Sequence, residues 1–225
     1  MKLVNREVHD FLKNHKVDYL FHANTVATSI SYLEIGGLLS RQSVENRKLY
    51  QTSQNSDFQD KRFNVYNDIF FDTIDLHKYF SRNNYYGPVC FVFSTDILLS
   101  SNFDIWITKQ NPINWKSSMK DTDKYISDLD ELESTWNDNR QKKMLTIKNI
   151  SDPISFQDLQ SIIIDNPQII KDRINYFEEA LNGIEKAGNS FQNKISERSC
   201  SNCYCHLNYS KMDSNRLNKL FLPKK

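Results

Sequence analysis

The feature that most constrains the fold of this chain is a set of short apolar runs rich in aromatic and β-branched residues. These runs have the length and composition of β-strands, and no regular alternation with helices separates them. They cover residues 17–22, 69–74, 89–93, 143–147 and 161–165. Helical periodicity is strongest near the two ends, over residues 3–16 and from Pro167 to Gly188. Strands in the middle and helices at the ends predict an α+β fold.

The N-terminal region and the apolar runs exclude several classes of protein. Charge interrupts each apolar run in residues 1–16, so we expect no signal peptide. No run approaches the roughly 18 apolar residues that a membrane helix needs. We therefore expect a soluble, cytoplasmic protein whose four Cys are reduced thiols or metal ligands.

Charge is distributed unevenly along the 225 residues, although the whole chain carries only +1. Eight Lys or Arg against two acidic residues give residues 186–225 a net charge of +6, so residues 1–185 carry −5. A basic tail can attract phosphate backbones, although a merely solvated helical tail also fits this composition. We expect one domain at residues 1–188 and a helical, basic, Cys-containing tail at residues 189–225.

The first candidate site lies where the first predicted strand ends. His22 and Asn24 stand there, and a short predicted helix leads to Gly36 and Gly37. An imidazole and an amide at a strand end can bind the polar groups of a small ligand, and glycine lets a backbone approach closely. A partly buried His with ordinary helix-ending glycines fits the same residues.

Several landmarks together resemble the DarT family of NAD-dependent nucleic-acid ADP-ribosyltransferases. The similarity spans roughly residues 17–165. Within this span, residues 40–65 are predicted to form a long polar loop, and loops of this length are usually functional or mobile. The landmarks are Tyr19-Leu20-Phe21-His22-Ala23-Asn24, Gly37-Leu38-Leu39, Arg62 before an aromatic strand, the strand at 89–93, Trp136, and the basic stretch 140–143.

The resemblance implies a split mixed sheet flanked by helices, with NAD as substrate. It assigns cofactor binding to His22, Asn24, Gly37, Leu38 and Arg62, with Arg62 also catalytic. It implies a glycosyl-transferring toxin of a toxin–antitoxin or antiviral defence system. The target would be a base in single-stranded DNA or in RNA, which the sequence does not separate. The implied partners are an antitoxin and, for an aromatic-rich chain, a chaperone.

One departure from the family pattern concerns catalysis. The family places Glu directly before the apolar pair of the strand at 143–147, where this chain has Lys143. A carboxylate there would stabilise an oxocarbenium-like ribose or accept a proton, whereas an ammonium opposes positive charge. We expect Lys143 to project toward the ligand at a partly solvated cleft mouth. The resemblance then implies a weak or inactivated enzyme, unless Glu131 or Glu133 supplies the acid.

Two alternatives remain open from the sequence. The protein can instead be a non-catalytic module that binds nucleic acid or protein and keeps a vestigial NAD cleft. Cys200, Cys203, Cys205 and His206 have spacing that can bind Zn²⁺, but the adjacent Cys205 and His206 point apart in an extended chain and no second knuckle follows. Unligated reduced thiols fit these residues better, so no metal is assigned.

Overall fold

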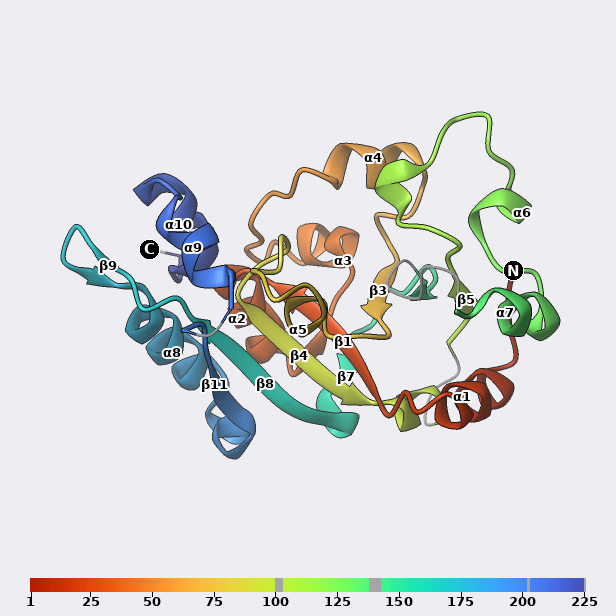
Figure 1. The fold of residues 1–225 in the computed structure, drawn as a ribbon, viewed down its shortest axis with the longest axis horizontal. Helices are drawn as coiled ribbons and strands as arrows, with labels where there is room; N and C mark the ends of the chain where they lie inside the picture. The colour runs from red at the N-terminus through yellow and green to blue at the C-terminus, as the bar shows by residue number, and fades with distance from the viewer. Residues whose placement is uncertain (100–102, 138–142, 202, 225) are drawn as a thin grey trace.

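A seven-stranded mixed sheet runs through the molecule in the computed structural model (Figure 1). The structure describes residues 1–99, 103–137, 143–201 and 203–224. The strand order is β11-β8-β4-β1-β3-β6-β5, and every neighbouring pair is antiparallel except β11 and β8. The strands are β1 (Tyr19–Asn24), β3 (Ile69–Asp72), β4 (Val89–Ser94), β5 (Ile105–Ile107), β6 (Met144–Ile147), β8 (Leu159–Asn166) and β11 (Ile195–Ser199).

Two small strand pairs and a set of helices surround this sheet. β2 (Gly37–Leu38) pairs with β7 (Ile154–Ser155), and β9 (Ile170–Lys171) pairs with β10 (Ile174–Asn175). The α-helices are α1 (Asn5–Asn14), α2 (Val26–Ile35), α3 (Arg41–Asn46), α4 (Asp57–Arg62), α5 (Leu76–Phe80), α6 (Asp121–Lys124), α7 (Leu129–Thr135), α8 (Tyr176–Ala187), α9 (Cys205–Ser210) and α10 (Ser214–Phe221). The 3-10 turns are η1 (Thr95–Leu98), η2 (Pro112–Asn114), η4 (Phe156–Asp158) and η5 (Asn189–Lys194). The expected α+β class is confirmed.

Aromatic side chains fill the centre of the sheet, as their number in the sequence suggests. Phe91 on β4 stacks on Phe156 with ring centres 5.5 Å apart, and Phe71 on β3 meets Phe93 edge to face at the same separation. Both geometries suit the quadrupole of an aromatic ring. These contacts hold β3 and β4 on either side of β1.

Helix α2 follows β1 directly in the chain and is buried over most of its surface. Seven of its ten residues are buried, which explains why it has no strongly polar face. Gly36 ends it with a φ of 75°, a left-handed conformation that glycine adopts without strain. α8 and α10 pack against it at the end of the molecule where the C-terminus lies (Figure 1).

The helix expected from Pro167 begins later than the sequence pattern predicts. Residues 170–175 form the β9–β10 hairpin, whose turn residues Asp172 and Arg173 have φ values of 53° and 66°. Asn175 then caps α8 by accepting from the backbone N–H of Glu178. The prediction was wrong because apolar residues of the hairpin have a spacing that also fits a helix.

The polar segment at residues 40–65 also differs from its expected loop conformation. It contains the short helices α3 and α4, and Ser40 caps α3 by accepting from the Ser43 N–H. The sequence did not indicate α3 and α4 because each helix has only six residues, and so few apolar positions give no clear helical periodicity.

The C-terminal tail contributes to the same sheet as the preceding residues. β11 pairs with β8 in parallel, from Ile195 beside Ile162 to Ser199 beside Asn166. The tail was expected to be helical, and it contains α9 and α10 in addition to β11. The boundary between residues 188 and 189 stays a prediction. Within the described part of the chain, no helix combines the length and the apolar character that crossing a membrane demands.

Candidate functional site

The sheet opens between β1 and β3, and this opening forms the candidate site. β1 shares six residue pairs with β4, whereas β1 and β3 share the single pair Phe21 and Asp72. Beyond that pair the two strands diverge, which matches the expected split sheet. A cavity that is partly open to solvent lies along the opening, and residues of both strands line it, among them His22 and Phe70.

His22 stands on β1 with its imidazole in this opening. Its Nδ1 lies 2.9 Å from the carbonyl oxygen of Phe70 on β3. A carbonyl only accepts, so Nδ1 carries the hydrogen and Nε2 presents a lone pair. Burial lowers the pKa of His22, which keeps the ring neutral, although the Phe70 carbonyl acts in the opposite direction. Nε2 is buried without a hydrogen-bond partner in the described residues, so it can accept from a ligand hydroxyl or amide.

Asn24 also lines the cavity, but its amide is bonded to neighbouring residues. Its Nδ2 donates to the Tyr32 hydroxyl at 3.2 Å, and its Oδ1 accepts from the Thr25 N–H at 2.9 Å and from Gln54 Nε2 at 3.4 Å. Tyr32 and Gln54 line the same cavity. Asn24 therefore orients two polar groups that a ligand would meet.

Arg41, which the sequence reasoning missed, is the cation of the cavity wall. Its Nε lies 2.6 Å from Asp57 Oδ1, and its Nη2 donates to Asp57 Oδ2 at 2.9 Å and to the Thr52 carbonyl at 3.0 Å. Nη1 is buried and has no hydrogen-bond partner among the described residues. The guanidinium is thus fixed on one side and available on the other, which suits an anionic or carbonyl oxygen.

Three carboxyl groups line the cavity, and two of them have pKa values near neutrality. Burial raises the pKa of Asp72 to about 7, with a smaller contribution from the nearby Asp75 carboxylate. Burial also raises the pKa of Asp60 to about 6, against a hydrogen bond from Ser56. Asp68 is paired with Lys148 at 3.0 Å. Asp72, at the end of β3, is therefore the carboxyl best suited to exchange a proton.

Gly37 and Leu38 lie next to the cavity lining rather than in it. They form β2, where a Cβ at Gly37 would meet the Ile154 carbonyl oxygen at 2.5 Å, so β7 accounts for the need for glycine. Leu39 is the residue of this motif that lines the cavity, and Arg41 two residues later lines it too. Cofactor binding by Gly37 and Leu38 stays a prediction.

Arg62 lies at the last position of α4 and does not line the cavity. Its side chain is exposed and donates to the Ser117 hydroxyl. On the same helix Phe58, four residues earlier, is 74% exposed, and residues so spaced share one helix face. The catalytic and cofactor roles of Arg62 stay predictions.

Lys143 is buried, so the expected partly solvated position is wrong. Only 3% of it is exposed, and its ammonium donates to the backbone carbonyls of Thr135 and Trp136 at the end of α7. Carbonyls at a helix C-terminus attract a cation, and this explains a lysine there. The next residue, Met144, is the one that lines the cavity, and residues 140–142 lie outside the described chain.

The two other acids considered from the sequence are engaged away from the cavity. Glu131 pairs with Lys109 and accepts from the Ser127 N–H at 2.8 Å. Glu133 pairs with His15 at 3.4 Å. Neither lines the cavity, so Asp72 takes their place as the candidate acid. Its position at the end of a strand was the signal available in the sequence.

The aromatic residues of the segments 40–65 and 100–136 differ in their exposure. Trp115 and Trp136 are 4% and 1% exposed and pack in the core. Phe58 is the strongly exposed ring of the 40–65 segment, and it lies on α4 between Ser56 and Asp60, which line the cavity.

Comparison with known proteins gives matches in structure only. No protein-family model matches the chain, and no curated protein matches its sequence. The structure is similar to DarT. The Thermus sp. 2.9 DarT structure in complex with ADP-ribosylated ssDNA has a TM-score of 0.47 and 14% identity, over 82% of this chain and 94% of that one.

Two further structures of the same Thermus sp. 2.9 protein also match. The complex with NAD⁺ has a TM-score of 0.44 and 14% identity, over 82% of this chain and 94% of that one. The complex with carba-NAD⁺ has a TM-score of 0.44 and 13% identity, over 82% and 95% of the two chains. DarT is also the family that the sequence motifs resemble.

Proposed function

We propose that the cavity between β1 and β3 binds NAD and that the protein transfers ADP-ribose to a base of single-stranded nucleic acid. The observation that carries this proposal is the neutral His22 imidazole in the opening of the sheet, whose buried Nε2 has no hydrogen-bond partner among the described residues. Two further groups line the same cavity: Arg41, whose Nη1 has no partner among the described residues, and Asp72, whose pKa lies near neutrality. NAD presents ribose hydroxyls, a carboxamide and phosphate oxygens to such groups.

Each of the three groups has a distinct part in the proposed reaction. His22 Nε2 accepts from a ribose hydroxyl or the carboxamide N–H, and Arg41 Nη1 donates to a phosphate or carbonyl oxygen. The bond between nicotinamide and ribose breaks, and its electron pair leaves with nicotinamide. Ionised Asp72 stabilises the cationic ribose, whose anomeric carbon then bonds to the nucleophilic atom of the base. The proton lost by the base moves to Asp72.

The nucleic acid would approach across α4. Phe58 offers an exposed ring for base stacking, and Arg62 offers a cation one helical turn away. The resemblance of the motifs supports a cytoplasmic toxin role, with an antitoxin as partner. The competing proposal is a non-catalytic module, which Lys143 at the position of the family's Glu supports.

The test is to incubate the protein with NAD and with matched oligonucleotides of single-stranded DNA, duplex DNA or RNA, and to detect ADP-ribose on them by mass spectrometry. We expect modification of a single-stranded oligonucleotide. Asp72→Asn should lower the rate by about 10²–10³, while Asp152→Asn, at an exposed carboxyl, should leave it unchanged. NAD binding without a modified product would favour the module.

A further inference from the structure

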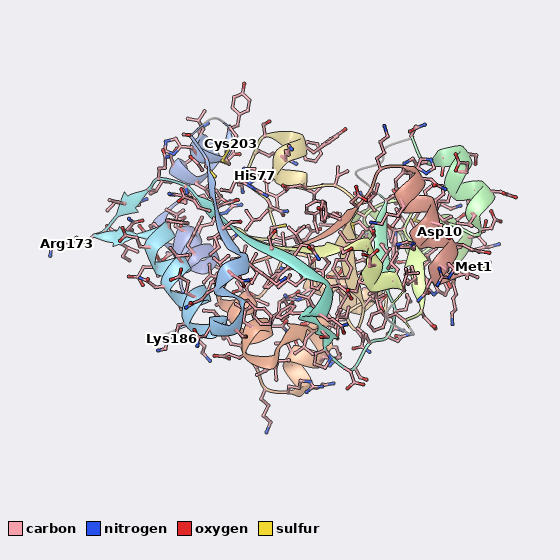
Figure 2. The ribbon with its side chains drawn as sticks, turned by 90° about the horizontal axis from the view of Figure 1, so that it is seen from below. Met1, Asp10, His77, Arg173, Lys186 and Cys203 are labelled. Carbon is pink, nitrogen blue, oxygen red and sulfur yellow. A yellow bond between two sulfur atoms is a disulfide. The ribbon has the colours of Figure 1, made fainter. Side chains whose placement is uncertain are left out.

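Four metal-binding side chains from distant parts of the chain meet on the side of the sheet formed by β8 and β11. They are His77 on α5, Cys200 directly after β11, Cys203 two residues before α9, and Cys205 at the first position of α9. Their ligand atoms all lie within 4.8 Å of one another. Figure 2 shows His77 and Cys203 side by side, and Cys203 Sγ lies 3.5 Å from His77 Nε2.

One edge of this cluster has the length expected in a tetrahedral zinc site. Zn–S and Zn–N bonds of about 2.3 and 2.0 Å place neighbouring ligand atoms roughly 3.5–3.8 Å apart. The separation of 3.5 Å between the Cys203 sulfur and the His77 nitrogen agrees with that edge. His77, Cys200 and Cys205 are at most 3% exposed, so the ligands are held within the protein.

A second observation comes from the hydrogen bonds of His77. Its Nδ1 lies 2.9 Å from Asp165 Oδ2, and these side chains are only 4% and 3% exposed. The carboxylate accepts, so Nδ1 carries the hydrogen and Nε2 directs its lone pair at the sulfurs. Zinc-binding histidines characteristically donate their other N–H to a carboxylate in this way. Tyr209 donates to the same Asp165 oxygen at 2.8 Å and fixes its orientation.

The fourth member of the cluster is therefore His77 and not His206, which directly follows Cys205 in the sequence. His206 Nδ1 lies 2.7 Å from the Pro167 carbonyl oxygen, and the residue is outside the cluster. The sequence pattern suggested His206 because it follows Cys205 directly. Sequence spacing could not identify His77, which reaches the cysteines only through the pairing of β4, β8 and β11.

We propose that Cys200, Cys203, Cys205 and His77 bind one structural Zn²⁺ in the reduced protein. With four protein ligands the coordination shell is complete, which is typical of structural rather than catalytic zinc. The ion would fasten the tail, through β11 and α9, to the segment that joins β3 to β4. The competing state is a disulfide between Cys203 and Cys205, whose sulfurs are in bonding contact.

Zinc content and thiol state separate these two states in the full-length protein. We expect about one zinc per chain after purification with reductant, measured by elemental mass spectrometry and native protein mass. His77→Ala should lose the metal, whereas His206→Ala should retain it. Cys90→Ala is a matched control because Cys90 is also buried but lies outside the cluster.

A measurement on the unmodified chain covers the case in which His77→Ala does not fold. Zinc is removed with a chelator and replaced with Co²⁺, whose thiolate charge-transfer absorption reports cysteine ligands. We expect one Co²⁺ to bind and Asp165→Asn to weaken it about tenfold or more. The proposal is overturned if the reduced protein binds neither metal, if its mass is lower by two hydrogens, or if His206→Ala alone loses zinc.

Discussion

Replacing Asp72 with Asn should change how the stability of the protein depends on pH. Burial raises the pKa of Asp72 from the ordinary value of 3.8 to about 7, so the folded protein holds this proton more tightly than the unfolded chain does. Ionisation of Asp72 therefore lowers the free energy of unfolding as the pH rises between these two values, and the loss is complete above pH 7. A shift of about three units corresponds to at most about 4 kcal/mol, reduced by any solvent screening.

The assay is urea denaturation of wild type and Asp72→Asn at several pH values between about 4 and 8. Asparagine does not ionise, so the variant should gain stability relative to wild type as the pH rises, by up to about 4 kcal/mol. Asp152→Asn, at a carboxyl that is 89% exposed, controls for the general effect of removing a charge. A difference between wild type and Asp72→Asn that stays constant with pH would refute the proposed neutral-range titration of Asp72.

Three further variants test the site. Lys143→Glu should lower the free energy of unfolding by about 3–5 kcal/mol, because it places a carboxylate against the α7 carbonyls; a stable variant with gained ADP-ribosylation would contradict this. Arg41→Lys should weaken NAD binding about tenfold in calorimetry, since the single nitrogen of lysine cannot occupy the separate positions of Nε, Nη1 and Nη2; unchanged affinity would remove Arg41 from the site. Phe58→Ala should weaken single-stranded DNA binding by about 1–3 kcal/mol in fluorescence anisotropy at constant NAD affinity, and equal DNA binding would remove α4 from the nucleic-acid surface.

The strands were predictable because their apolar runs are continuous and end at turn residues. β4 and β6 lie within one residue of the expected positions, and β8 extends the expected strand at both ends. The hairpin at 170–175 was missed because its turn depends on positive φ values at Asp172 and Arg173, residues that carry no glycine-like signal. Local pattern determines where strands lie, but backbone conformations of single residues determine how the chain reverses.

The candidate site was predictable only where one strand carries its residues. His22 and Asn24 follow from the end of β1, and both line the cavity. Arg41 and Asp72 reach the same cavity from α3 and β3, so their proximity depends on the opening of the sheet and not on spacing. Lys143 was misplaced because a one-residue shift along a strand exchanges the side chain that faces the cavity, and Met144 occupies that position.

Calorimetric titration with NAD tests the central claim, that the cavity between β1 and β3 is an NAD site, most directly. We predict that the wild-type protein binds NAD and that His22→Ala weakens binding at least about tenfold, because the Nε2 acceptor is lost. The melting temperature should change little, and Glu133→Gln, at an acid outside the cavity, should bind as wild type does. Absence of binding by wild type at about millimolar NAD, or full affinity in His22→Ala, would contradict the account.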